Sequence, residues 1–150
     1  MLNPDYAEML SALSDAGAEY IVVGAFALAA HGNPRSTGDI DILVRPTSEN
    51  AERVMAALDH FGAPLSQISH LDFLKEDTVF QIGVTPRRID LLTALEGVDD
   101  FGEAWDSHVL AIVDGMEIPV LGRDILIKNK RALARPQDLA DVAWLEANSE

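Results

Sequence analysis

The segment Asp39-Ile-Asp-Ile-Leu-Val44 is the stretch from which the predicted fold follows. Its acidic and apolar residues alternate with the period of a β-strand, so Asp39 and Asp41 share one face while the isoleucines share the other. Asp is rare in strands, and two carboxylates about 5–7 Å apart repel each other unless a cation lies between them. A magnesium site with oxygen ligands explains the pair. The alternatives are solvated acids on an edge strand, or Asp39 as a turn cap.

A second segment, Arg88-Ile-Asp-Leu-Leu-Thr93, again places one acid among strand-forming apolar residues. If its strand lies beside the first, Asp90 completes a site of three carboxylates. Such a site can hold two metal ions and clamp the oxygens of a phosphoryl group during transfer. The alternative is an ion pair between Asp90 and one of its neighbours, Arg87 or Arg88.

Upstream of the acids, a short β-branched strand at 20–23 meets a predicted helix at 25–31. Gly24 at the junction allows close approach of the backbone, and the first helical N–H groups can receive a phosphate. An ordinary packing glycine is the alternative. In the loop that follows, the guanidinium of Arg35 matches phosphate oxygens, although a structural salt bridge explains it equally well.

The remaining pattern predicts an α/β (α+β) class: one domain, 1–150, with a mixed β-sheet flanked by helices. Helical periodicity indicates helices from Pro4 to near Gly17 and over 48–61, 123–134 and 136–147. Further strands are expected at 79–84, 88–93, 109–113 and 116–121, the last two joined at Asp114-Gly115. We expect Val54, Leu58 and Phe61 to be buried on one helix face, and Trp105 and Trp144 to lie in the core.

Composition narrows the function classes. The chain has 150 residues, a formal net charge of −14 and no cysteine, and it lacks an apolar run long enough to span a bilayer. These features predict a soluble cytoplasmic protein without an extended nucleic-acid surface. Four basic residues nevertheless gather near the C-terminus, at Lys128, Lys130, Arg131 and Arg135. A solvated helix face is the favoured interpretation of this basic cluster, and a local patch for nucleotide or nucleic acid is the other.

Taken together, these segments resemble a known signature. Val22-Val-Gly-Ala-Phe-Ala27 followed by Thr37-Gly-Asp-Ile-Asp-Ile42 is similar to the motif of the DNA polymerase β-like nucleotidyltransferase superfamily, which has a third acid on a later strand. The resemblance extends through Phe101-Gly-Glu-Ala-Trp105 to Lys128 and the segment Ala134-Arg-Pro-Gln-Asp-Leu-Ala-Asp141. Over nearly the whole chain it looks like small bacterial nucleotidyltransferases akin to the toxins of abortive-infection systems.

The resemblance implies roles for individual residues. Asp39, Asp41 and Asp90 would bind Mg²⁺ or Mn²⁺ and form the catalytic group. The nucleotide would be contacted by Gly24, Ala25, Arg35, Thr37 and Lys128, the last of which faces either the triphosphate or the helix packing. Ala25 departs from the family pattern, which usually has Gly or Ser, and alanine offers no hydroxyl to a phosphate.

The expected function is transfer of a nucleoside monophosphate from an NTP to an unknown protein, RNA or small-molecule acceptor. Two alternatives remain open. Ala25 favours a non-catalytic binding module or antitoxin-like subunit with a protein partner. The basic cluster is the only support for a toxin that modifies the acceptor end of transfer RNA. The four histidines lack zinc-ligand spacing and are interpreted as surface or packing residues.

Overall fold

The computed structural model describes residues 2–33 and 38–148. In this part of the chain six strands form one sheet in the order β3-β4-β2-β1-β6-β5. The strands are β1 (Tyr20–Val23), β2 (Ile40–Val44), β3 (Val79–Ile82), β4 (Ile89–Leu92), β5 (Val109–Val113) and β6 (Met116–Val120). The helices are α1 (Pro4–Asp15), α2 (Gly24–Ala30), α3 (Ser48–Phe61), α4 (Phe101–Asp106), α5 (Arg123–Leu133) and α6 (Pro136–Ala147). Two 3₁₀ turns, η1 (Leu65–Gln67) and η2 (Asp72–Leu74), follow α3.

The sheet is mixed. Its centre pairs β2 in parallel with β4 and antiparallel with β1, and β1 in turn runs parallel to β6. Two antiparallel hairpins, β3–β4 and β5–β6, complete the two sides. The two acidic segments identified in the sequence are therefore adjacent parallel strands, as predicted.

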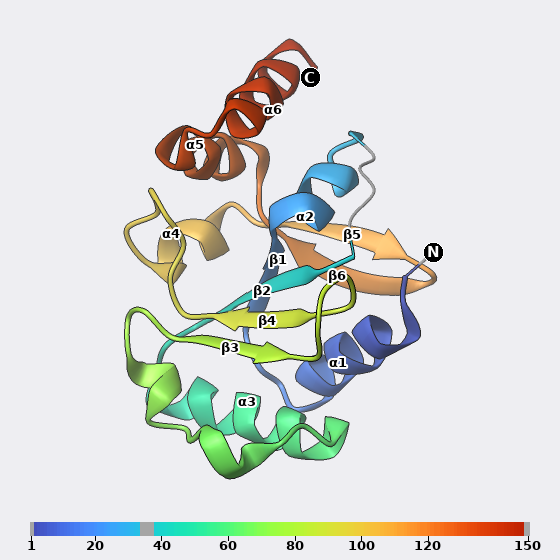
Figure 1. Ribbon diagram of the computed structural model, residues 1–150, viewed down its shortest axis with the longest axis vertical. Helices are drawn as coiled ribbons and strands as arrows, with labels where there is room; N and C mark the ends of the chain where they lie inside the picture. The colour runs from blue at the N-terminus through green and yellow to red at the C-terminus, as the bar shows by residue number, and fades with distance from the viewer. Residues whose placement is uncertain (1, 34–37, 149–150) are drawn as a thin grey trace.

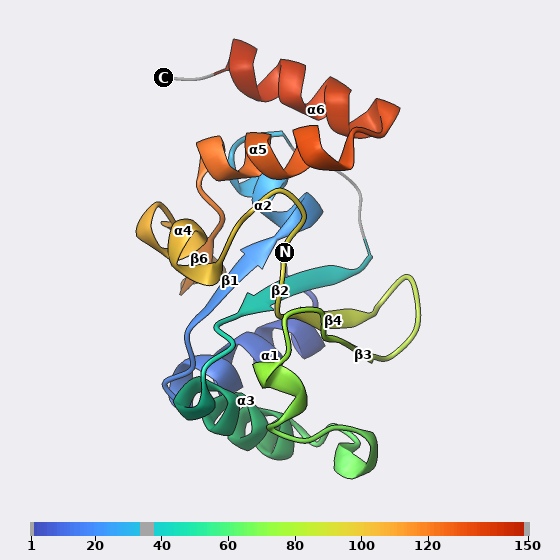
Figure 2. The ribbon, with the colours of Figure 1, turned by 90° about the vertical axis from the view of Figure 1, so that its left-hand side faces the viewer.

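Helices cover both faces of the sheet (Figures 1 and 2). The alternation of side chains in β1 illustrates the two layers, because Val22 packs into a core shared with α1 and α3, while Ile21 and Val23 pack into a second core with α2, α4, α5 and α6. In Figure 2, α5 and α6 stack on the side of the molecule opposite α3. No helix of the described residues is long and apolar enough to cross a membrane.

Local sequence signals explain where several elements begin and end. The side chain of Asn3 accepts a hydrogen bond from the N–H of Asp5 at the start of α1, and the Thr47 side chain accepts one from Asn50 at the start of α3. Gly62, at a φ of 93°, ends α3 in the left-handed conformation that glycine tolerates. Asp114 and Gly115 both have positive φ, which suits the tight turn between β5 and β6.

Three details differ from the expectations. Val54 and Leu58 are buried, but Phe61 is only partly buried because it lies in the last turn of α3, at the edge of the core. Trp105 and Trp144 are also only partly buried, packed against the second core rather than within it. The short helix α4 had no helical pattern long enough to predict, although Asp100 caps it by accepting from the N–H of Glu103.

Candidate functional site

Two aspartates meet at the centre of the sheet. In the parallel pairing of β2 and β4, Asp41 lies directly opposite Asp90. Asp90 is buried and Asp41 is partly buried, while Asp39 stands immediately before β2. The predicted neighbourhood of Asp41 and Asp90 is thereby confirmed, and it depends on the pairing of segments almost fifty positions apart in the sequence.

The electrostatic consequence falls on Asp41. Its pKa is raised from 3.8 to about 6, first because the carboxyl is buried and second because the Asp90 carboxylate lies beside it, with a smaller contribution from Asp39. Burial and like charge both disfavour the ionised form. Asp41 is thus a carboxylate that a nearby cation would stabilise.

Arg88 provides a positive charge on the other side of the group. Its Nε lies 2.7 Å from Asp90 Oδ1 and its Nη2 lies 3.1 Å from Asp90 Oδ2, a bidentate pair. Nη2 also lies 3.6 Å from Asp39 Oδ2, and the backbone N–H of Arg88 donates to Asp39 Oδ1 at 3.0 Å. The ion pair proposed as an alternative for Asp90 therefore coexists with its position beside Asp41. Among the described residues, no three acidic, cysteine or histidine side chains stand ready-made around a metal position.

Gly24 approaches the acids from the end of β1. It has a φ of +69°, and a Cβ added to it would lie 2.7 Å from Asp41 Oδ2. A side chain at this position would press on the carboxylate, so glycine is required both by conformation and by space. Gly24 lies beside Asp41 because Val23 pairs with Asp41 in the β1–β2 register.

A cavity of about 490 Å³ opens in front of Asp41 and the β1–α2 turn. Gly24 and Ala25 form one wall. The opposite wall comes from α5, α6 and the segment after β4, and it carries Asn129, Lys130, Arg135, Gln137, Asp138 and Asp141. Its size falls in the range of small-molecule sites, and its lining mixes polar groups of both charges.

Lys130 is the functional candidate that sequence reasoning missed. It is 7% exposed, with Nζ 3.0 Å from Asp141 Oδ2 and 3.7 Å from Asp138 Oδ1. Arg135 also pairs with Asp138, through Nε at 2.5 Å, and this contact helps to hold the pKa of Asp138 below its usual range. The available signal was the closing motif itself, in which Asp138 and Asp141 lie one helical turn apart on the face of α6 toward α5.

The lysine and arginine of the basic cluster that lie away from the cavity form ion pairs with glutamates. Lys128, the cluster member predicted to contact nucleotide, forms an ion pair with Glu103 and does not line the cavity. Arg131 pairs with Glu146 at 2.7 Å. Lys128 and Arg131 thus fit the helix-face interpretation, whereas Lys130 and Arg135 line the cavity beside Asp41. Two other predicted contacts, Arg35 and Thr37, lie outside the described residues.

Comparison with known proteins gave matches among solved structures. No protein-family model fits the sequence, and no curated protein is significantly similar to it. A "putative nucleotidyltransferase" from Thermotoga maritima matches with a TM-score of 0.62 and 19% identity, over 98% of this chain and 96% of that one. Lincomycin-bound lincosamide antibiotic adenylyltransferase LnuA matches with a TM-score of 0.59 and 11% identity, over 99% of both chains. The chain has the nucleotidyltransferase fold.

A third matching structure contains an adenylylated ligand. ANT(2'')-Ia in complex with adenylyl-2''-tobramycin matches with a TM-score of 0.59 and 14% identity, over 93% of this chain and 84% of that one. The three matches together confirm the fold class that the sequence predicted, a mixed sheet flanked by helices. At these sequence identities the matches support the fold alone. The roles of individual residues rest on the geometry of the site.

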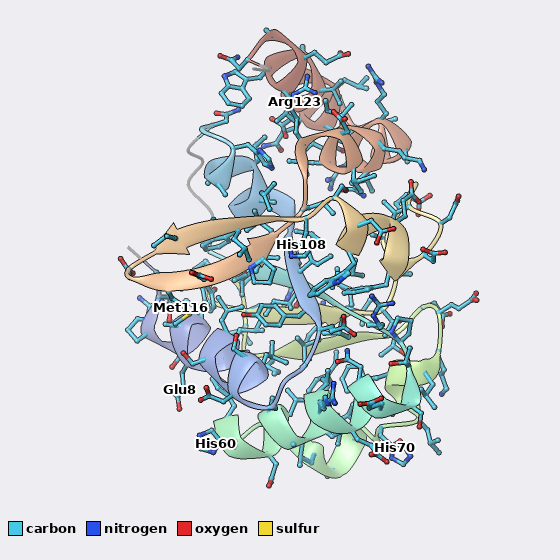
Figure 3. All side chains as sticks on the ribbon, turned by 180° about the vertical axis from the view of Figure 1, so that it is seen from behind. Glu8, His60, His70, His108, Met116 and Arg123 are labelled. Carbon is cyan, nitrogen blue, oxygen red and sulfur yellow. The ribbon has the colours of Figure 1, made fainter. Side chains whose placement is uncertain are left out.

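The histidines of this nucleotidyltransferase fold lie outside the lining of the cavity beside Asp41. His31 Nε2 lies 2.8 Å from the carbonyl oxygen of Leu121, and His108 Nδ1 lies 2.5 Å from that of Trp105. Figure 3 shows His60 and His70 at the α3 end of the molecule, well away from His108. These positions agree with the interpretation of the histidines as packing or surface residues.

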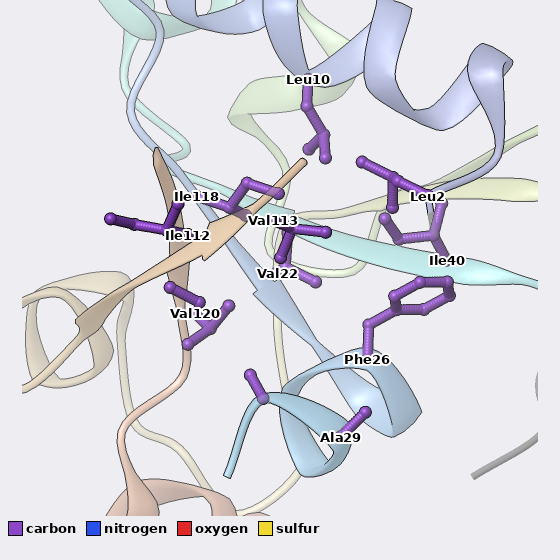
Figure 4. Close-up of a pocket in the computed structure, with 12 residues that line it drawn as sticks. Leu2, Leu10, Val22, Phe26, Ala29, Ile40, Ile112, Val113, Ile118 and Val120 are labelled. Atoms are coloured by element: carbon purple, nitrogen blue, oxygen red, sulfur yellow. The ribbon is translucent and has the colours of Figure 1, made fainter. Parts of the chain in front are cut away.

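A second cavity, also about 490 Å³, lies against the face of the sheet that packs on α1 (Figure 4). Leu10 from α1, Val22 from β1 and Phe26 from α2 line it together with aliphatic residues of the β5–β6 hairpin. Its described lining carries no charged side chain. An anionic triphosphate would find no charged partner among the described residues that line this second cavity.

Proposed function

We propose that this protein is a metal-dependent nucleotidyltransferase that moves a nucleoside monophosphate from an NTP to an acceptor. The observation that carries the proposal is the pairing of Asp41 with Asp90 on adjacent parallel strands, beside a turn where Gly24 leaves room for the Asp41 carboxylate. The polar cavity that Asp41 lines has a volume in the range of small-molecule sites. Structural likeness to two antibiotic adenylyltransferases supports the same chemistry.

In the proposed reaction an acceptor oxygen forms a bond to the α-phosphorus, and the bond from that phosphorus to the bridging oxygen of the β-phosphate breaks. Pyrophosphate leaves, and the acceptor proton passes to a base or to water. Backbone N–H groups at Gly24 and Ala25 would contact the phosphates, and the ion pairs of Lys130 would hold α5 and α6 in place at the cavity wall. Arg35 and Thr37 remain predicted contacts, and Lys128 remains one only if its pair with Glu103 opens.

The three carboxylates are of the ligand type that binds divalent cations. Asp39 and Asp41 offer oxygen ligands on one strand, and Asp90 adds a third, which is the donor type that Mg²⁺ and Mn²⁺ prefer. Burial first, and the neighbouring carboxylates second, raise the pKa of Asp41, and a bound cation would favour its ionised form. When bound, such a metal supplies charge neutralisation on the triphosphate and lowers the pKa of an acceptor hydroxyl.

Metal binding is expected to depend on pH through Asp41. Because its pKa of about 6 in the folded protein exceeds the ordinary 3.8, protonated Asp41 stabilises the metal-free fold, and this contribution is lost as pH rises through about 6. Metal requires the ionised carboxylate, so Mg²⁺ should raise the melting temperature little near pH 5 and most above about pH 7. Thermal melts with and without Mg²⁺ over this range provide the measurement.

The control for the pH experiment is the double variant Asp39→Asn, Asp41→Asn. It should remove the Mg²⁺-dependent rise at every pH and stabilise the metal-free protein near neutral pH, because the carboxylate repulsion is gone. A rise of the same size in the double variant would place the metal elsewhere.

Ala25 offers a test of the phosphate position. Ala25→Ser places a hydroxyl at the turn and should tighten NTP binding about 3- to 10-fold, the equivalent of one typical hydrogen bond of about 1 kcal/mol. Ala25→Trp should block the same cavity wall and weaken binding by at least as much. Titration calorimetry with ATP in the presence of Mg²⁺ measures both. If neither change alters the affinity, the phosphates do not lie at this turn.

The acceptor is proposed to be a small molecule with a hydroxyl group. A net charge of −14 opposes nucleic acid, and the basic cluster that supported an RNA acceptor is paired with acids. The two adenylyltransferases among the matches carry antibiotic ligands. LnuA is matched over 99% of its chain, so a protein of about this length binds a small-molecule antibiotic in that case.

The proposed function is tested by following label. Each α-labelled NTP is incubated with the protein, Mg²⁺ and one of four acceptors: lincomycin, tobramycin, transfer RNA or total cell protein. Label on a small molecule with release of pyrophosphate is the expected result. Label on transfer RNA would instead support the toxin hypothesis, and label on protein would identify a protein acceptor.

A non-catalytic binding module is the second candidate. It is favoured by Ala25, which cannot donate a side-chain hydrogen bond to a phosphate, and by the ion pair that occupies Asp90. In that case wild-type protein would bind NTP or a protein partner without transferring label to any acceptor, and Asp90→Asn would leave binding unchanged.

A further inference from the structure

The acidic site contains its own cation. Arg88 reaches Asp90 with two nitrogens, at 2.7 and 3.1 Å, and its Nη2 lies 3.6 Å from Asp39. Thr85 completes the arrangement, because its Oγ1 accepts from Arg88 Nη1 at 3.2 Å and donates to Asp39 Oδ2 at 3.1 Å. The guanidinium therefore joins two of the three carboxylates proposed to hold metal, and both oxygens of Asp90 are engaged.

We propose that Arg88 competes with the divalent metal for Asp90 and Asp39, so that metal binding requires its guanidinium to swing out of the site. The inference rests on the proposed function, because it assumes a metal at these carboxylates. It explains why the described acids are not gathered as a ready-made metal site. An oxygen of Asp90 that already accepts a charge-assisted hydrogen bond is a weaker ligand than a free one.

The surroundings allow this movement. The Arg88 side chain is 30% exposed, whereas that of Asp90 is 8% exposed, so the arginine can turn toward solvent while the buried acid stays in place. The anchoring of Asp39 does not depend on the guanidinium, because the backbone N–H of Arg88 also donates to Asp39. Once released, the guanidinium remains a bidentate donor that can bind another anion.

The same geometry gives Arg88 a second effect in the metal-free protein. Asp90 is buried, and an ionised carboxylate in that position needs a partner. Arg88 provides one, which lets the fold form before metal arrives. Asp41, opposite Asp90, carries the raised pKa.

The test compares Arg88→Gln with Arg87→Gln. Glutamine keeps hydrogen-bonding capacity beside Asp90 but removes the charge, and Arg87 is an exposed neighbour that provides the matched loss of charge. Mn²⁺ binding without nucleotide is measured by titration calorimetry and by the electron paramagnetic resonance of free Mn²⁺. The expected result is a Kd about tenfold lower in Arg88→Gln than in wild type, with at most a small change in Arg87→Gln.

Thermal melts provide a second measurement. In chelator, Arg88→Gln should melt below wild type, and Mn²⁺ should produce a larger rise in melting temperature than it does in wild type. Arg88→Lys keeps the charge but loses the bidentate geometry, so its rise in melting temperature with Mn²⁺ should lie between those of wild type and Arg88→Gln. This variant serves as the test if Arg88→Gln folds poorly. A merely structural role for Arg88 would lower metal affinity when it is removed, not raise it.

Each outcome has a distinct meaning. Equal Mn²⁺ affinity in wild type and Arg88→Gln would overturn the proposed competition. If Asp41→Asn then abolishes Mn²⁺ binding, the proposed metal site itself still holds. Binding in Arg88→Gln but not in wild type would support the competition in its strongest form. No Mn²⁺ binding in either protein would contradict the proposed metal site together with the inference.

Discussion

Asp90→Asn is expected to lower the rate of nucleotidyl transfer on the order of 10²-fold or more while leaving NTP affinity nearly unchanged. Asp39 and Asp41 can still hold a metal on the triphosphate, but the side of the site next to Asp90 loses its charge. Asparagine is preferred to alanine because it keeps a hydrogen-bond acceptor for Arg88, which otherwise loses both of its contacts to this side chain. The rate is measured with α-labelled NTP and the NTP affinity by titration calorimetry.

Asp124→Asn is the matched control for this change. Asp124 lies on α5 with its side chain 86% exposed, so the same chemical substitution should leave transfer and stability as in wild type. If Asp90→Asn transfers label at the wild-type rate, Asp90 has no part in the chemistry. If it loses NTP binding in proportion to rate, its role is in binding rather than in transfer.

Lys130→Ala is expected to have the largest effect on stability, about 3 kcal/mol or more. Lys130 lies between Asp138 and Asp141, which are 1% and 2% exposed, and its removal leaves two buried carboxylates with less compensation. Because this group joins α5 to α6 at the cavity wall, the loss should also weaken NTP binding. Urea denaturation measures the free energy of unfolding.

Lys128→Ala controls for the loss of one lysine on the same helix. Lys128 pairs with Glu103 at an exposed position, and its removal should cost far less than that of Lys130. Equal losses in the two variants would show that the buried network does not stabilise the C-terminal helices. A stable Lys130→Ala that no longer binds NTP would assign Lys130 to the nucleotide alone.

The sequence was most informative where the signal is local. The alternation in β2 and the Asp114-Gly115 turn predicted strands, because each depends on a few consecutive residues. The pairing of β2 with β4 was a prediction of a different kind. It required the two acidic strands to come together to form one site, and the structure confirms that they are neighbours.

Side-chain partners were harder to predict, for a physical reason. Spacing shows that Lys128 and Lys130 are both on α5, but only the packing of α6 against α5 decides that Lys130 is buried between two acids while Lys128 faces Glu103. In the same way the sequence left Asp90 with two alternatives, a carboxylate cluster or an arginine pair. Both occur, because the strand register places Asp90 opposite Asp41 while the Arg88 side chain independently pairs with the same carboxylate.

The central claim is that Asp41 and Asp90 form a metal site beside a nucleotide. A crystal structure with Mn²⁺ and a non-hydrolysable NTP, with data collected at the manganese edge, tests it most directly. We expect an anomalous peak about 2.0–2.3 Å from carboxylate oxygens of Asp41 and of Asp39 or Asp90, with the phosphates against Gly24 and Ala25. Nucleotide bound elsewhere, or manganese that contacts none of these carboxylates, would contradict the claim.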